Sequence, residues 1–212
     1  MLALSGPDLR QLVSMRNAIH LVGSAFQELS EGRALSPLRT PLLIRPERST
    51  TLVMPAFVPG ASALGVKVVS IFADNPGRGL PTITALVAIF DDETGQPLAI
   101  MDGAYLTALR TGAVSGAATE ILARKDATVL TVIGAGVQAM TQALAVAEVR
   151  SLQRINVIAR SRGSQERFVA TAERDWPDLA PLLAIDVDLA NAVREADIIC
   201  TATTSRNPVF DD

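Results

Sequence analysis

The sequence predicts an α/β protein in two parts, an α+β part followed by a doubly wound, mainly parallel part. Short β-type runs separated by Pro, Gly and Ser fill residues 36–102, which is typical of an antiparallel or mixed sheet. From residue 128 onward, strand-like and helix-like runs alternate, as they do in parallel βαβ units. We expect two domains, residues 1–118 and residues 119–212.

The most informative stretch is Thr128 to Ala139, TVLTVIGAGVQA. An aliphatic, β-branched run leads into Gly134-Ala135-Gly136, and a helix-forming run begins at Gln138. Strand, glycine turn and helix are the context that a dinucleotide-binding fingerprint requires. Gly134 would make the tight turn, and Gly136, without a Cβ, would let a pyrophosphate approach the helix N-terminus. The second part is therefore predicted to be a Rossmann-type domain that binds NAD(P), with an ordinary glycine turn as the alternative.

Composition excludes several other classes of protein. The net charge of −3 and the pI near 5.2 give no indication of nucleic acid or of an anionic membrane as a partner. No apolar run approaches the about 20 residues of a membrane span, and the N-terminus MLALSGPDLR lacks the features of a signal peptide. One Cys and one His are too few for a zinc site. We expect a cytoplasmic protein without a metal.

The first part begins with helices and continues with strands. Apolar residues recur at helical spacing over residues 5–32, with a second helix from Met15 and a stop at Gly32. Strands are expected in PLRTPLLI, TTLVMPAF and GVKVVSI, and then in Ile83–Phe90 and Pro97–Asp102. His20 receives no functional role.

A further helix is predicted from Gly103 to Leu122, with small residues such as Ala108, Gly112 and Ala118 along one face. Small side chains allow a neighbouring backbone or a ligand to approach closely. Arg110 lies among them, and it is either a surface cation or an anion clamp. The chemistry of the residue leaves both roles open.

The end of the second nucleotide strand, Ile155 to Ala159, indicates which cofactor is preferred. An acidic residue there would accept hydrogen bonds from the ribose hydroxyls of NAD. This chain instead carries Arg160-Ser161-Arg162, and cations with a hydroxyl suit the 2′-phosphate of NADP. NADP is therefore favoured over NAD, with solvated loop charges as the alternative.

The rest of the chain continues the alternation. We expect a helix over Ser164–Arg174, a strand over Leu182–Val187, a short helix over Ala190–Glu195 and a strand over Asp197–Thr203. The last strand contains Cys200, which is predicted to be a buried, inert thiol. About four strands are fewer than a full doubly wound domain has, so the nucleotide domain is expected to be incomplete.

Several strings together resemble the ornithine cyclodeaminase/mu-crystallin family over essentially the whole chain. The strings are SPLRT, TTLVMPAF, GVKVVS, GRGLPT, TGQPLAIMDGAYLTALRTGA, VIGAGVQA and ADIICTATTS. Members of this family have an N-terminal substrate and dimerisation domain and a Rossmann domain. They use a nicotinamide cofactor on amino and imino acids. The resemblance thus implies a homodimer and a small amino or imino acid as the substrate.

The resemblance also assigns roles to individual residues. It places Arg39, Lys67 and Arg110 around the substrate carboxylate, with Lys67 as the catalytic proton donor if burial among cations lowers its pKa. A strand-edge lysine kept in solvent is the alternative for Lys67. Matches to cofactor-side positions of the family are Thr82, Thr111, Val137, Gln138, Thr201, Ala202 and Thr203. The predicted cofactor site also includes Arg110 and the residues of the glycine turn and the arginine motif, namely Gly134, Ala135, Gly136, Arg160, Ser161 and Arg162.

Three departures from the family pattern affect the expected activity. Cyclodeaminases carry a Glu where this chain has Leu52, and an Asp after the second nucleotide strand where it has Arg160-Ser161-Arg162. The family's catalytic Asp follows the TATTS strand, beyond the last residue of this sequence, so a C-terminally truncated chain is expected.

These features favour an NADPH-dependent ketimine reductase acting on a pyrroline-2-carboxylate-like imino acid. The alternatives are an NAD-dependent ornithine cyclodeaminase, which converts ornithine to proline and ammonia, and an alanine-type dehydrogenase. An inactive cofactor-binding fragment is the non-enzymatic alternative.

Overall fold

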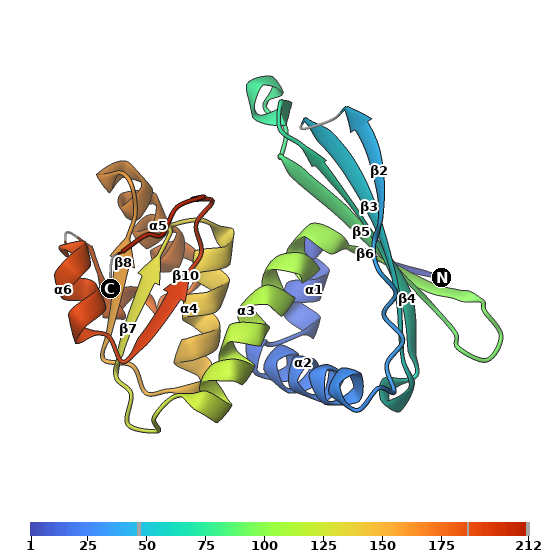
Figure 1. Ribbon diagram of the computed structural model, residues 1–212, viewed down its shortest axis with the longest axis horizontal. Helices are drawn as coiled ribbons and strands as arrows, with labels where there is room; N and C mark the ends of the chain where they lie inside the picture. The colour runs from blue at the N-terminus through green and yellow to red at the C-terminus, as the bar shows by residue number, and fades with distance from the viewer. Residues whose placement is uncertain (46–47, 186, 211–212) are drawn as a thin grey trace. The chain divides into compact units, whose positions relative to one another are not determined.

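The computed structural model describes residues 1–45, 48–185 and 187–210 (Figure 1). The chain divides into two compact units. The first unit comprises Met1–Ser14 and Gly23–Thr107, and the second comprises Met15–Val22 and Ala108–Asp212. Two long helices, α2 (Met15–Ser30) and α3 (Gly103–Leu122), therefore each contribute residues to both units.

The first unit is built on a six-stranded sheet with the order β1-β6-β5-β4-β3-β2. Its strands are β1 (Leu2–Leu4), β2 (Thr40–Arg45), β3 (Ser49–Val58), β4 (Ala63–Phe72), β5 (Ile83–Phe90) and β6 (Pro97–Asp102). β1 pairs in parallel with β6 and all the other pairs are antiparallel. The expectation of a mixed sheet is confirmed, and β1 is a strand that the sequence did not predict.

Short helices complete the first unit. α1 (Gly6–Leu12) begins at a capping box, in which the Ser5 amide donates to the Asp8 carboxylate at 2.8 Å and the Ser5 hydroxyl accepts from the Asp8 amide. The 3₁₀ helices η1 (Pro59–Ala61) and η2 (Asn75–Arg78) follow β3 and β4. α2 is followed by Gly32 at φ +73°, so the predicted glycine stop is confirmed.

The second unit contains a four-stranded parallel sheet with the order β10-β7-β8-β9. The strands are β7 (Val129–Ile133), β8 (Arg154–Ile158), β9 (Leu183–Ala184) and β10 (Ile198–Thr201). They alternate with the helices α4 (Val137–Val149), α5 (Arg162–Asp175), η3 (Ala180–Leu182) and α6 (Leu189–Glu195). The predicted βαβ alternation is confirmed, although β9 spans two residues where a longer strand was expected.

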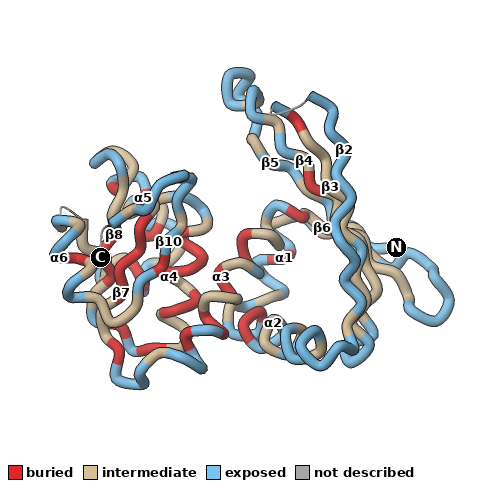
Figure 2. Tube along the Cα trace, viewed as in Figure 1, coloured by how far each residue is buried: buried red, intermediate tan, exposed pale blue. Residues whose placement is uncertain are grey.

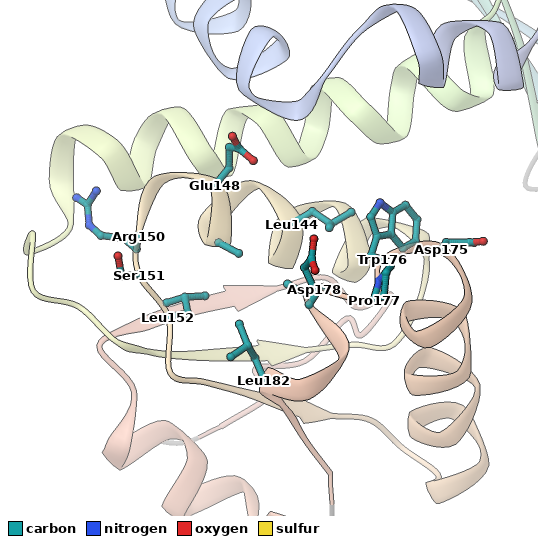
Figure 3. Close-up of a pocket in the computed structure, with 12 residues that line it drawn as sticks. Leu144, Glu148, Arg150, Ser151, Leu152, Asp175, Trp176, Pro177, Asp178 and Leu182 are labelled. Carbon is teal, nitrogen blue, oxygen red and sulfur yellow. The ribbon is translucent and has the colours of Figure 1, made fainter.

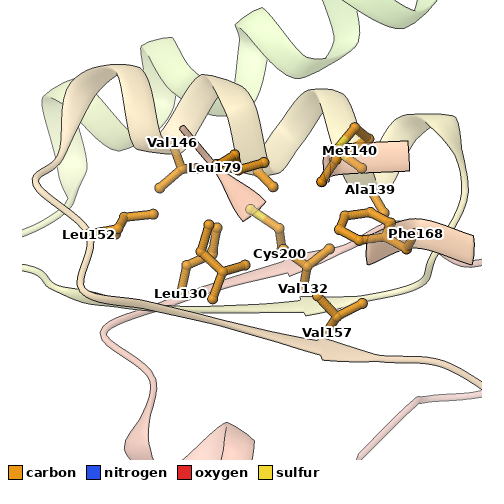
Figure 4. Packing of buried hydrophobic residues seen from close by; sticks show 13 residues of the cluster. Leu130, Val132, Ala139, Met140, Val146, Leu152, Val157, Phe168, Leu179 and Cys200 are labelled. Atoms are coloured by element: carbon orange, nitrogen blue, oxygen red, sulfur yellow. The ribbon is translucent and has the colours of Figure 1, made fainter. Parts of the chain in front are cut away.

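The core of the second unit lies between this sheet and the helices α4 and α5 (Figures 2 and 4). Leu130, Val132, Ile155 and Val157 are fully buried on the central strands, because a strand covered on both faces carries a near-continuous apolar run. Cys200 belongs to the same cluster, and burial raises the pKa of its thiol to about 11. The predicted burial of this thiol is confirmed.

Glycines allow α3 to pack closely inside the second unit. A Cβ on Gly112 would lie 2.4 Å from the Thr141 carbonyl oxygen of α4, and a Cβ on Gly116 would lie 2.6 Å from the Ile19 side chain. The small-residue face of α3 is thus used for helix packing, whereas Ala118, expected on that face, is exposed. Arg150 donates to the carbonyls of Thr119 and Ala123, both at 2.7 Å, and so caps the C-terminal end of α3.

Within the described ranges, no helix combines the length and apolar character of a membrane span. The same residues contain no cluster of three or more His, Cys, Asp or Glu side chains suited to a metal ion.

Candidate dinucleotide-binding site

Three strand ends meet at one edge of the parallel sheet. The Gly134 amide donates to the Ile158 carbonyl, and the Ala202 amide donates to the Ile133 carbonyl, each at 2.7 Å. Gly134 has φ +128°, and a Cβ there would lie 2.2 Å from the Ala202 carbonyl oxygen. Both facts demand glycine, because a side chain would be strained and would collide with backbone. This is the carboxyl edge, where open α/β sheets bind their ligands.

Gly136 differs from Gly134 in what surrounds it. It is the N-cap of α4 with φ −100°, and a Cβ there would meet nothing within 4 Å. Among the described residues, no side chain caps this helix, and its first turn contains no acidic residue. The amides of the first turn therefore face open space, which fits the pyrophosphate of a dinucleotide.

A cavity of about 550 Å³ opens in front of this turn. The predicted cofactor residues that line it are Gly134, Ala135, Gly136, Arg160, Ala202 and Thr203. Five further predicted residues lie next to these in the sequence but outside the lining, namely Val137, Gln138, Ser161, Arg162 and Thr201. Gln138 retains a buried Oε1 without a hydrogen-bond partner among the described residues.

The lining also contains residues to which the sequence gave no role in the site, among them Ser164, Leu189, Pro208 and Val209. Ser164 could have been placed from the sequence, because Ser161 and Ser164 have the spacing of a helix N-cap and the third residue of the helix. The Ser161 hydroxyl accepts from the Ser164 amide at 3.3 Å. Thr204 and Ser205 belong to the TATTS string, which was expected at the ligand-binding carboxyl edge of the sheet. Residues 206–209 follow it without a motif of their own, so nothing in their sequence connected them with the cavity.

The loop after β8 carries the predicted phosphate-binding residues. Arg160 is exposed and lines the cavity, and no carboxylate is present at the strand end to accept ribose hydroxyls. Arg162 turns to its own helix, where its Nε lies 2.9 Å from the Glu166 carboxylate. The two arginines of the motif therefore have different surroundings.

The first unit holds three of the predicted residues. Thr40 pairs with Val53, and Val53 pairs with Val68. Arg39 directly precedes Thr40, the first residue of β2, and Lys67 directly precedes Val68 on β4. The two strands are two spacings, about 10 Å, apart in the sheet. Thr82 follows η2, and its carbonyl accepts from the Phe72 amide at 2.8 Å.

The side chain of Leu52 lies on the same face of the sheet as the side chain of Lys67. Leu52 pairs with Val69, and Met54, two residues further along β3, pairs with Lys67. Residues two apart on a strand share a face, so an aliphatic side chain lies on the Lys67 face where cyclodeaminases were expected to carry a Glu. Val69 is 8% exposed, which makes this part of the face apolar.

Arg110 and Thr111 lie on α3 in the second unit. Arg110 is exposed, yet partial burial of its guanidinium lowers the pKa of the group. Arginine stays charged across the accessible pH range, so this side chain remains a cation that can bind an anion.

A second cavity, of about 490 Å³, lies at the opposite edge of the parallel sheet (Figure 3). It is lined by the end of α4 and by the segment after α5, including Trp176 and Asp178. Two of its carboxylates have ion-pair partners: Glu148 pairs with Arg16 at 2.7 Å and Asp175 pairs with Arg174 at 2.9 Å. Because the amino ends of the strands face it, this cavity differs from a cofactor cleft.

Comparison with known proteins agrees with this geometry. The chain is 39% identical to a Δ¹-pyrroline-2-carboxylate reductase of Bacillus cereus over 212 residues, covering 100% of this chain and 64% of that protein. The solved Δ¹-pyrroline-2-carboxylate reductase of Thermococcus litoralis, in complex with NADH and L-proline, matches with a TM-score of 0.89 and 40% identity over 99% of this chain and 64% of that one. An archaeal alanine dehydrogenase dimer with bound NAD matches with a TM-score of 0.87 and 33% identity, covering 99% and 62%.

The chain thus spans about 64% of the length of these reductases. The family model described as ornithine cyclodeaminase/mu-crystallin matches residues 3–212, so the resemblance noted in the sequence is confirmed. The protein belongs to the ornithine cyclodeaminase/mu-crystallin family.

Proposed function

We propose that this protein is an NAD(P)-dependent reductase of a small cyclic imino acid of the Δ¹-pyrroline-2-carboxylate type. One observation carries the proposal: the open cradle at Gly136, uncapped at the start of α4 and continuous with a cavity of about 550 Å³. The reductases to which the chain is similar support the substrate class.

The chain's own residues have distinct roles in this reaction. Amides at the start of α4 bind the pyrophosphate, and Gly134 holds the turn in place. Arg39 and Arg110 bind the substrate carboxylate, for which a guanidinium is suited. Lys67 donates a proton to the imine nitrogen. When bound, the reduced nicotinamide supplies the hydride to the C=N carbon.

We propose NADP as the preferred cofactor. Arg160 lines the cavity and the loop after β8 lacks a carboxylate, so the end of the site that receives the adenosine ribose is cationic. A 2′-phosphate is stabilised by such a setting, whereas the ribose hydroxyls of NAD find no acidic acceptor there. The remaining cofactor contacts expected from the sequence, at Thr82, Thr111, Val137, Gln138 and Thr201, stay part of this proposal.

We further propose that residues 1–118 bind substrate and form a homodimer, whereas residues 119–212 bind the nucleotide. The similar alanine dehydrogenase is a dimer. β2 is an edge strand whose six residues are all exposed, including Leu42, Leu43 and Ile44. An apolar, unpaired edge strand usually pairs with another chain.

The second candidate function is ornithine cyclodeamination, which the family itself supports. It requires a carboxylate to hold the substrate amine, and Leu52 with its apolar neighbour Val69 occupies that part of the sheet face. The reductase needs no such carboxylate, because its imine substrate lacks the free amine. A cofactor-binding chain without turnover is the non-enzymatic alternative.

The test combines binding with turnover. We expect a fluorescence titration of the 212-residue chain to give tighter binding of NADPH than of NADH. Oxidation of NADPH should follow addition of Δ¹-pyrroline-2-carboxylate, and Lys67→Met should lower kcat by about 100-fold or more without changing the NADPH Kd. Turnover of ornithine in place of the imino acid would establish the cyclodeaminase, and NADPH binding without any turnover would establish the non-enzymatic alternative.

A further inference from the structure

We propose that Arg167, acting through Ser164, is the second cation that recognises the 2′-phosphate of NADP, in place of Arg162 from the sequence motif. The inference rests on the proposed nucleotide function of the cavity. It adds a specificity-determining residue outside the loop in which the sequence placed both cations.

The geometry connects Arg167 to the cavity by one hydroxyl. Arg167 Nη2 donates to the Ser164 Oγ at 3.0 Å, and Ser164 lines the cavity together with Arg160. Arg167 Nη1 lies 3.6 Å from the position that a Cβ on Gly163 would take. The guanidinium is thus folded back over the first turn of α5, towards the cavity.

Ser164 is placed to pass this charge on to a ligand. Its Oγ lies 3.0 Å from the Ser161 Oγ, and either hydroxyl can be the donor of that bond. When Ser161 donates, the Ser164 hydroxyl hydrogen is available to a ligand, because the Arg167 bond uses only a lone pair of the Ser164 oxygen. A phosphate oxygen accepting that hydrogen would lie about 2.7 Å from the Oγ. It would then be about 6 Å or less from the guanidinium, inside the Debye length of about 8 Å at physiological ionic strength.

A charge count selects Arg167 over Arg162. A phosphate monoester carries a charge of about −1.5 to −2 at neutral pH, so a single arginine does not balance it. Arg162 already has the Glu166 carboxylate at 2.9 Å. Among the described residues, Arg167 has the Ser164 hydroxyl as its hydrogen-bond partner and pairs with no carboxylate. Arg160, which lines the cavity, and Arg167, which is bonded to a lining hydroxyl, are therefore two cations near the loop after β8 for which the described residues supply no paired carboxylate.

The position of Arg167 is otherwise unfavourable for a cation. Its guanidinium reaches the first turn of α5, which contains no acidic residue, and positive charge at a helix N-terminus opposes the helix dipole. A bound dianion would remove this repulsion. If the Arg167 side chain turned away from the cavity, it would avoid this repulsion even without a bound ligand.

The experiment isolates the phosphate by comparing adenosine 2′,5′-bisphosphate with 5′-AMP, titrated calorimetrically at low salt into the full chain. We expect Arg167→Gln to weaken binding of the bisphosphate by about tenfold and to leave 5′-AMP unchanged, as loss of one charge-assisted contact predicts. Arg167→Lys should restore part of the loss. Arg162→Gln is the matched control, with an expected change below about threefold.

The outcomes separate the two levels of the proposal. Equal losses for both ligands in Arg167→Gln, or a larger loss in Arg162→Gln, would overturn the role of Arg167 while leaving the nucleotide site intact. Failure of the unmodified chain to bind either nucleotide would instead refute the proposed function. A circular dichroism spectrum identical to that of the unmodified chain confirms that each variant is folded.

Discussion

At the scale of single residues, the two glycines of the turn have different physical requirements. Gly134 is held at φ +128° against the Ala202 carbonyl, whereas Gly136 has ordinary backbone angles and open space in front of it. We expect Gly136→Ala to change the free energy of unfolding by less than about 1 kcal/mol yet to weaken NADPH binding by at least about tenfold, because its methyl group takes the space of the pyrophosphate. Urea unfolding and NADPH titration measure the two effects.

Gly134→Ala is the companion variant. It should lose stability as well as binding, since strain at positive φ and overlap with backbone each cost energy in the folded state before any ligand is present. If Gly136→Ala bound NADPH as tightly as the unmodified chain, the pyrophosphate would have to lie elsewhere. If Gly134→Ala unfolded at the same urea concentration as the unmodified chain, this result would contradict the close approach of residue 134 to the Ala202 backbone.

At the scale of elements, Asp197 links the start of β10 to the start of β7. Its carboxylate accepts from the amides of Thr128 at 2.8 Å and Val129 at 3.0 Å, and it pairs with Arg124. The two amide hydrogen bonds, helped by the Arg124 charge, lower the pKa of this carboxyl below its usual value. Lowering of the folded-state pKa means that the ionised carboxylate stabilises the native state.

The sign of the pH effect follows from that shift. The stabilisation is fully present above the unfolded-state pKa of about 3.9 and is lost as the pH falls through the lower folded-state pKa. Asp197→Asn should therefore unfold at lower urea than the unmodified chain near pH 7, and the difference should shrink as the pH falls below the unfolded-state pKa and on through the lower folded-state pKa. Asp126→Asn is the control, since Asp126 is 78% exposed and 3.7 Å from the same Arg124. An Asp197→Asn difference that stayed constant with pH would contradict this role.

The elements also show what the sequence can and cannot predict. Helix α3 and the strand-turn-helix around Gly134 were predicted closely, because residue period and glycine placement are local signals. β1 was missed, since three residues show no period and pair with β6 only through a long-range contact. Arg162 was assigned to the phosphate with Arg160, yet its pairing with Glu166 and the turn of Arg167 towards Ser164 depend on side-chain conformations that no motif encodes.

At the scale of the whole molecule, the chain divides into two units, and ligand binding should stabilise the unit that binds. The chain's one tryptophan, Trp176, follows α5 in the second unit and lines the cavity opposite the cofactor edge. Its fluorescence therefore reports unfolding of the second unit without direct contact with the nucleotide. Oxidised NADP at about 100 times its Kd adds about 2.7 kcal/mol to the free energy of unfolding.

For a unit of this size, that free energy corresponds to a rise of about 10 °C in the midpoint of the Trp176 transition. The Gly136→Ala variant supplies the control, because it should retain the ligand-free midpoint and show little of the rise. A rise of the same size in Gly136→Ala would mean that the nucleotide stabilises the chain from another site. An unmodified chain whose Trp176 midpoint did not move at saturating NADP would show that the second unit does not bind the cofactor, since a ligand that binds only the folded state must raise its stability.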